Sequence, residues 1–164
     1  MKKLITSCAA LLLTAGMAHA DMSIKLGGGW DGKTVPEGQQ CTLFDGNGST
    51  PPMEISSLPS GTAWVHVEFN DRDYPPLSEN GGHGVIGYPV EGSSADIYSV
   101  PGLAGELPGD AKVVSPAKGT GEYASDGYMP PCSGGKGNNY FAVVKAISSS
   151  GDVIEEQVVE MGQY

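Results

Sequence analysis

Residues 69–89 of the chain read FNDRDYPPLSENGGHGVIGYP. Two apolar, strand-like runs flank a loop rich in Gly, Pro and Asn, and this loop separates Asp71 and Asp73 from His83. Prolines 75 and 76 end the first run, because proline cannot donate to the hydrogen-bond ladder of a sheet. Only eleven residues lie between Asp71 and His83, so the chain must turn back within this loop. The stretch therefore predicts a site at one end of two neighbouring strands, where carboxylates lie beside an imidazole.

The surrounding sequence indicates a mainly β protein with little helix. It contains 25 Gly and 12 Pro, which punctuate short apolar runs rather than long helical faces. Residues 62–69 alternate between apolar and polar side chains, as a strand with one buried face requires. We expect residues 84–90 and 139–147 to be its neighbours in one sheet. Residues 92–121 are expected to be a loop with at most a helical turn near 95–98, and residues 153–161 fit a strand better than a helix because of their β-branched side chains.

A set of ordered motifs resembles the phosphatidylethanolamine-binding protein family, in its bacterial Raf-kinase-inhibitor-like branch. The family has a D-x-D-x-P segment, a downstream histidine, and a turn containing Pro and Cys before a G-x-H-R-Y-x-F strand. The matching positions are Asp71, Asp73, Pro75, His83, Pro131, Cys132, Tyr140 and Phe141. The segments STPPMEI (49–55) and LPSGT (58–62) extend the resemblance upstream. It implies one β-sandwich domain over residues 21–164, with a shallow anion-binding pocket formed by Asp71, Asp73, His83, Pro131, Asn138 and Tyr140.

The chain departs from the family pattern at Asn138 and Asn139, where the family has a histidine and an arginine. An amide can donate to a phosphate oxygen, but it brings no charge. We therefore expect weaker anion binding than the family pattern implies, with a neutral or zwitterionic ligand as an alternative. Arg72, the only arginine, would restore the charge if it turned inward, although a solvated position is the simpler expectation.

The first twenty residues have the plan of a signal peptide. A basic start with Lys2 and Lys3 precedes an apolar run over residues 4–15, and Ala18-His19-Ala20 forms a cleavage site before Asp21. A lipoprotein site at Cys8 is the alternative, although it would leave almost no apolar stretch before the cysteine. No later stretch has the ~18 apolar residues of a membrane span. The sequence thus predicts a periplasmic or secreted protein.

Charge limits the partners that this protein can bind. Loss of Lys2 and Lys3 with the signal peptide leaves 7 basic and 19 acidic residues, a net charge of −12. Such a field repels nucleic acid and anionic membranes. We expect a small anionic or phosphorylated ligand instead. The sequence does not indicate an oligomeric state.

Two cysteines, Cys41 and Cys132, remain after cleavage. In an oxidising compartment such a pair predicts a disulfide. Two buried free thiols are the alternative, and a metal site is disfavoured because no further ligands accompany the pair. The sequence also contains no H-E-x-x-H, G-x-S-x-G or Walker motif, so we expect neither a metal nor a cofactor.

Three functions fit these observations. The first is a small-ligand binding module without catalytic activity, whose shallow pocket takes a small anion or a phosphorylated or phospholipid-like head group. The second is a hydrolase-like enzyme that uses an Asp71/His83 acid–base pair, and the third is a ligand-free structural β-domain of the cell envelope. In the third case Asp71 and Asp73 would be turn residues, and His83 would be bonded to a neighbouring carbonyl. For the first two, we expect the Asp71 carboxylate to hydrogen-bond His83, with Asn138 or Tyr140 across a small cavity.

Overall fold

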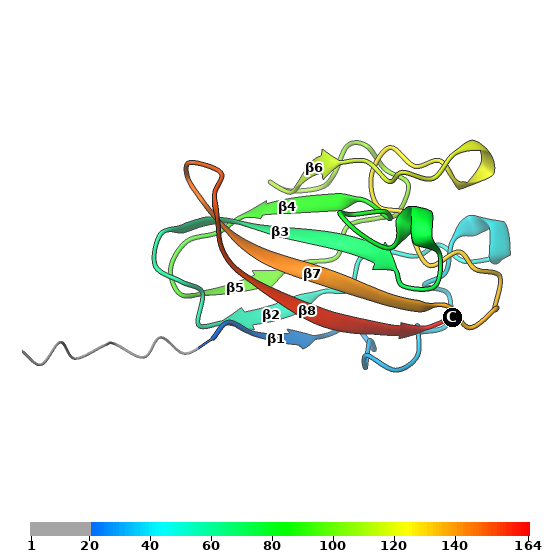
Figure 1. Ribbon diagram of the computed structural model, residues 1–164, viewed down its shortest axis with the longest axis horizontal. Helices are drawn as coiled ribbons and strands as arrows, with labels where there is room; N and C mark the ends of the chain where they lie inside the picture. Colours follow the sequence, from blue (N-terminus) through cyan, green and yellow to red (C-terminus); the bar gives the residue numbers. More distant parts are fainter. Residues whose placement is uncertain (1–20) are drawn as a thin grey trace, which may run out of the picture.

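The computed structural model describes residues 21–164, which fold into two antiparallel β-sheets. The predicted signal peptide and Cys8 lie outside the described residues. The smaller sheet has the order β1-β2-β5, formed by β1 (Ser23–Leu26), β2 (Met53–Ser56) and β5 (Ser94–Ile97). The larger sheet has the order β6-β4-β3-β7-β8. The two sheets form a sandwich (Figure 1), which confirms the predicted mainly β fold.

The larger sheet is built around β3 (Thr62–Asp71). This strand pairs with β4 (Val85–Pro89) on one side and with β7 (Asn139–Ser148) on the other. The predicted neighbours of this strand are therefore confirmed. Its edges are β6 (Lys112–Ser115) and the eleven-residue β8 (Val153–Gln163).

The alternating pattern of β3 separates its two faces. Val65, Val67 and Phe69 are buried in a core that also contains Met53 and Ile55 of the smaller sheet. Each such side chain contributes roughly 1.5–3 kcal/mol when it is fully removed from water. On the opposite face of β3, Trp64, His66 and Glu68 are only half-buried.

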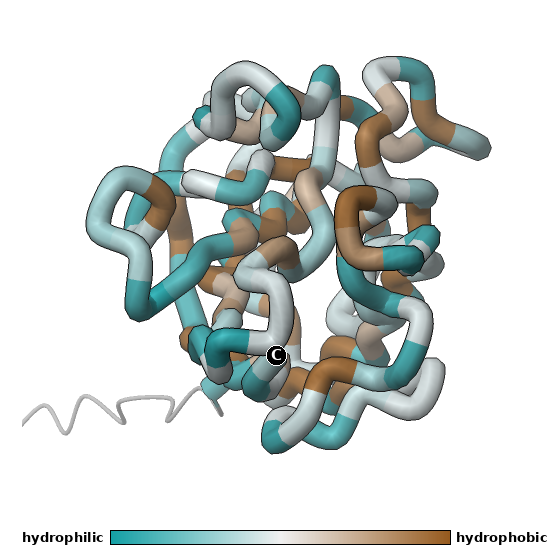
Figure 2. The backbone as a smooth tube through the Cα atoms, turned by 90° about the vertical axis from the view of Figure 1, so that its right-hand side faces the viewer, coloured by the Kyte–Doolittle hydropathy of each residue, from teal (hydrophilic) through white to brown (hydrophobic). Residues whose placement is uncertain are grey.

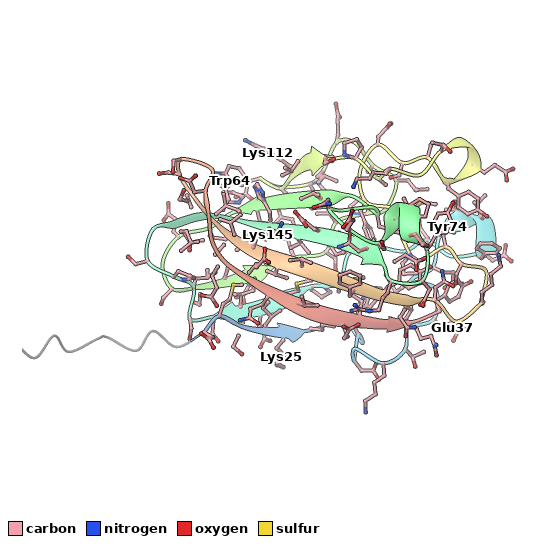
Figure 3. All side chains as sticks on the ribbon, viewed as in Figure 1. Lys25, Glu37, Trp64, Tyr74, Lys112 and Lys145 are labelled. Carbon is pink, nitrogen blue, oxygen red and sulfur yellow. A yellow bond between two sulfur atoms is a disulfide. The ribbon has the colours of Figure 1, made fainter. Side chains whose placement is uncertain are left out.

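Charged groups cover this outer face. Lys145 of β7 donates to Glu68 at 2.7 Å, and the ammonium of Lys112 lies 4.9 Å from the centre of the Trp64 ring (Figure 3). The alternation along β3 thus decides which side chains enter the core and which remain near solvent.

Two expectations for the second half of the chain need correction. Residues 94–97 form strand β5 and not a helical turn, because pairing with β2 places Ile97 opposite Met53, where both side chains are buried. Residues 112–115 form strand β6 within the range expected to be loop. The expectation of a strand after residue 153 is confirmed, and β8 continues to Gln163.

Helix is limited, within the described residues, to three 3₁₀ turns of three residues each: η1 (Thr42–Phe44), η2 (Pro75–Leu77) and η3 (Gly121–Tyr123). All three turns lie at the same end of the sandwich as the C-terminus (Figure 1), and Figure 2 looks onto this end. None of the helical segments in the described part of the chain is long and apolar enough to cross a membrane. The loops at this end form the candidate site.

Candidate functional site

A cavity of about 720 Å³ opens at the loop end of the sandwich. We call it the end cavity. Its floor consists of the buried residues Asp71, His83, Met129, Cys132 and Tyr140. Its mouth is lined by exposed side chains, among which are Tyr74, Lys118, Tyr123 and Lys136. A volume of this size lies in the range of ~300–1,000 Å³ that is typical of small-molecule sites.

Asp71 is the last residue of β3 and lies opposite Tyr140 in the register with β7. One of its carboxylate oxygens accepts the backbone N–H of Asp73 at 2.9 Å, and the other accepts an amide N–H of Asn138 at 2.7 Å. Both bonds offset the cost of burying a carboxylate. The strand end and the following turn therefore hold one buried negative charge at the floor of the end cavity.

His83 is held by its backbone and by one ring nitrogen. Its backbone N–H donates to the carbonyl of Phe69, and its Nδ1 lies 2.8 Å from the carbonyl of Met129. Since a carbonyl can only accept, we infer that Nδ1 carries the proton, which leaves the lone pair of the neutral ring on Nε2. Nε2 is buried and has no hydrogen-bond partner among the described residues.

The protonation of His83 follows from its burial. Burial lowers the pKa of His83, while the bond to Met129 and the charge of Asp71 act in the opposite direction. A lowered pKa means that the ring is mostly neutral at pH 7. His83 therefore offers an acceptor to the end cavity at neutral pH and a donor under acidic conditions.

Tyr140 contributes a hydroxyl to the same floor. Its oxygen accepts the backbone N–H of Cys132 at 3.1 Å, and its ring meets the ring of His83 edge-on, with centroids 5.4 Å apart. Burial raises the pKa of Tyr140 to about 12, so the hydroxyl keeps its proton and can donate it to a ligand.

The expected hydrogen bond between Asp71 and His83 is not among the hydrogen bonds of the described residues. The carboxylate is instead bound by Asn138, and the ring nitrogen by the carbonyl of Met129. The expectation was wrong because these two partners, which are remote in sequence, compete for the groups that would have formed the pair. Asn138 and Tyr140 both line the end cavity.

Two of the predicted site residues do not line the end cavity. Asp73 is exposed, and one of its carboxylate oxygens accepts both the backbone N–H and the amide N–H of Asn139, at 2.7 and 2.9 Å. These bonds lower the pKa of Asp73 and tie the turn after β3 to the start of β7. Pro131 is buried, and its carbonyl accepts the backbone N–H of Cys41. Both residues position the cavity wall.

Arg72 does not restore the missing positive charge. It pairs with Glu160 and stacks over the ring of Phe141 at 4.2 Å, outside the set of lining residues. The positive charges at the end cavity come instead from Lys118 and Lys136. Sequence reasoning missed both lysines, together with Tyr74 and Tyr123, because they lie in loops that no motif connects to Asp71 or His83.

The predicted disulfide between Cys41 and Cys132 is present, with Cα atoms 5.2 Å apart. The two cysteines and Met129 form a second, smaller core, against which Phe44 packs. This small core carries the wall of the end cavity. No group of three or more His, Cys, Asp or Glu side chains that could hold a metal ion occurs in residues 21–164.

Comparison with known proteins shows the fold of the chain. No family model and no curated protein sequence matches it. Among solved structures, a phosphatidylethanolamine-binding protein homologue from Chlamydia trachomatis is similar, with 21% identity and a TM-score of 0.53 over 88% of this chain and 97% of the other. YbcL of E. coli, described as a new member of the mammalian family of these proteins, is 19% identical, with a TM-score of 0.55 over 88% of this chain and 98% of the other.

Proposed function

We propose that this chain, which has the fold of the phosphatidylethanolamine-binding protein family, is an exported module that binds a small ligand through a phosphate or similar anionic group. The group is placed on the floor of the end cavity, between His83 and Tyr140. One observation carries the proposal most directly: His83 is 3% exposed, lines the cavity, and has a buried Nε2 without a partner among the described residues. A buried polar atom of this kind costs stability unless a ligand or a water molecule satisfies it.

A phosphate monoanion matches the hydrogen-bonding groups of this floor. Its P–OH can donate to Nε2 of neutral His83, and its other oxygens can accept the Tyr140 hydroxyl proton. Protonated His83 with a phosphate dianion has the same number of protons. Either complex therefore carries one proton more than neutral His83 with a free dianion, the form of phosphate that prevails at alkaline pH. The charge of Asp71 disfavours a second negative charge on the ligand. Binding should therefore strengthen as the pH falls.

The lysines at the mouth explain how an acidic protein could attract an anion. The described chain contains far more acidic than basic residues, yet Lys118 and Lys136 both lie at the end cavity. Lys118 is positioned by a bond from its ammonium to the carbonyl of Glu79 at 3.0 Å. The lysines supply a local positive field, which raises the concentration of anions at the mouth.

Binding fits the arrangement better than acid–base catalysis does. A hydrolase would use Asp71 and His83 as a hydrogen-bonded pair, whereas here the Asp71 carboxylate is bound by Asn138 and Nδ1 of His83 by Met129. A purely structural role, in turn, assigns no protein partner to Nε2 of His83 within the described residues. Export is supported by the signal-like residues 1–20 and by the disulfide, which persists in oxidising compartments.

Thermal unfolding with and without phosphate tests this function. At ten times Kd, a ligand that binds only the folded state adds about 1.4 kcal/mol, which corresponds to a shift of several degrees in Tm. We expect the shift to be larger at pH 5.5 than at pH 8. His83→Gln and Tyr140→Phe should each reduce it, whereas His66→Gln, on the outer face of the larger sheet, should not.

One further measurement distinguishes a lipid head group from the free ion as the source of the bound phosphate. Dihexanoyl phosphatidylethanolamine in place of phosphate shows whether a lipid head group binds more tightly than the free ion. A phosphate response that is absent at both pH values, or that persists unchanged in both floor variants, would contradict the proposed function.

A further inference from the structure

The end cavity is much larger than a phosphate group, and its mouth differs chemically from its floor. The floor is buried and carries the polar groups of Asp71, His83 and Tyr140. The mouth carries two exposed tyrosines: Tyr74 is 52% exposed and Tyr123 is 43% exposed. Figure 3 shows Tyr74 at the loop end of the molecule. A phosphate on the floor alone would leave these rings uncovered.

A third ring, that of Phe44, forms a fixed part of the wall. Gly134 approaches it so closely that a Cβ at this position would lie 2.8 Å from a ring carbon of Phe44. Gly134 also has φ of +70°, a conformation that residues with a side chain rarely adopt. The disulfide anchors both neighbours, because Cys41 precedes Phe44 by three residues and Cys132 precedes Gly134 by two. The ring of Phe44 thus lines the cavity between two segments that the disulfide joins.

From these observations we infer the class of ligand: an anionic group carried on a planar ring, with the anion on the floor and the ring between the aromatic side chains of the mouth. This inference rests on the proposed function, since it assigns the part of the ligand that the floor does not hold. Rings pack favourably against tyrosine and phenylalanine in offset or edge-to-face arrangements. The lysines beside the tyrosines also suit a ligand whose net charge is negative.

The test compares three probes on the intact protein by calorimetry at pH 6: inorganic phosphate, phenyl phosphate and n-butyl phosphate. We expect phenyl phosphate to bind about tenfold more tightly than inorganic phosphate, as one or two aromatic contacts would provide. Butyl phosphate, which adds a flexible chain, should bind less tightly than phenyl phosphate.

Variants of the mouth tyrosines test whether these residues cause the tighter binding of phenyl phosphate. The double variant Tyr74→Ala/Tyr123→Ala should lose most of the tenfold gain, yet bind inorganic phosphate within twofold of the wild type. Tyr74→Phe/Tyr123→Phe should retain the gain because it keeps both rings. Val158→Ala, at a 59% exposed apolar residue of β8 outside the cavity, is the matched surface control.

The possible outcomes distinguish this inference from the function on which it rests. Equal affinity for phenyl phosphate and inorganic phosphate would refute the inference that the ligand carries a ring, but would leave the anion site intact. The inference would also be refuted if the variant without both tyrosines still bound phenyl phosphate about tenfold more tightly than inorganic phosphate. Butyl phosphate binding as tightly as phenyl phosphate would replace the ring with a flexible apolar chain. Absence of binding for all three probes would instead refute the proposed function itself.

Discussion

Reduction of the Cys41–Cys132 disulfide should lower the free energy of unfolding by about 4.6 kcal/mol at 25 °C. The bond spans a sequence separation of 91 residues, so it removes a large loop-closure entropy from the unfolded chain. For a domain of this size, such a loss corresponds to a decrease in Tm of roughly 10 to 20 °C.

The effect on the end cavity should be greater than the effect on the sheets. The disulfide lies in the smaller core with Met129, whose carbonyl holds Nδ1 of His83. The backbone N–H of Cys132 also holds the hydroxyl of Tyr140. Once the disulfide is reduced, the backbone hydrogen bond from Cys41 to Pro131 remains, but the covalent link between the two loops of this wall is lost. We therefore expect phosphate affinity to fall while far-ultraviolet circular dichroism still reports a β-rich fold.

Urea unfolding followed by tryptophan fluorescence measures the change, with oxidised and phosphine-reduced protein compared at pH 7. An equal m-value in both states would show that the change lies in stability and not in the surface exposed on unfolding. The double variant Cys41→Ala/Cys132→Ala is the control, because phosphine should not affect it. A loss below ~1 kcal/mol, in protein shown by thiol titration to be fully reduced, would refute the reasoning from loop closure. Two free thiols in unreduced, denatured protein would refute the disulfide itself.

Three further predictions concern the floor and the strand that leads from it. Burial lowers the pKa of His83, so the unfolded state binds more protons than the folded state as the pH falls. The contribution of His83 to the free energy of unfolding should therefore be fully present above pH ~6.5, the pKa of an unperturbed histidine, and should decrease as the pH falls from there toward 5. In urea unfolding, the free energy of unfolding of His83→Gln should decrease less with falling pH than that of the wild type. If the decrease is unchanged in His83→Gln but lost in His66→Gln, the titrating group is His66 and the prediction is wrong. Asn138→His should strengthen phosphate binding at pH 5.5 by about 1 to 2 kcal/mol, because it adds a charged donor next to a buried carboxylate; calorimetry that shows equal or weaker binding would contradict this. Gly84→Ala should destabilise the fold by more than the roughly 1–3 kcal/mol of backbone strain alone, since its Cβ would lie 2.6 Å from a backbone carbonyl oxygen; Gly92→Ala, which also has positive φ but nothing within 4 Å, isolates the strain, and equal losses in both variants would exclude the clash.

The sequence alone determined the fold class and the centre of the larger sheet. Alternation over residues 62–69 is a local property, because a strand with one buried face must repeat every two residues. The structure confirms its consequences in the burial of Val65, Val67 and Phe69 and in the pairing of β3 with β4 and β7. The disulfide also followed from sequence, because only two cysteines remain after the predicted cleavage. The roles of the site residues in ligand binding remain predictions.

Only the tertiary structure decided the strands that lack a strong local pattern. Residues 94–97 do not alternate clearly between apolar and polar side chains. They form β5 because they pair with β2, which buries Ile97 in the core. Residues 112–115 likewise become a strand by pairing with β4. In both cases the hydrogen bonds to a remote strand outweigh the weak local preference of a short segment.

The same distinction holds at the candidate site. The sequence motifs predicted that Asp71, His83, Asn138 and Tyr140 lie near one another. They did not predict the hydrogen-bond partner of each residue. Asn138 lies 67 residues from Asp71 along the chain, and Met129 lies 46 residues from His83. The mouth of the end cavity combines loops that are equally remote in sequence, those that carry Tyr74, Tyr123 and Lys136. Hydrogen bonds and cavity walls depend on directions and distances between such segments, and these exist only once the two sheets have packed and the disulfide has joined the loops at one end.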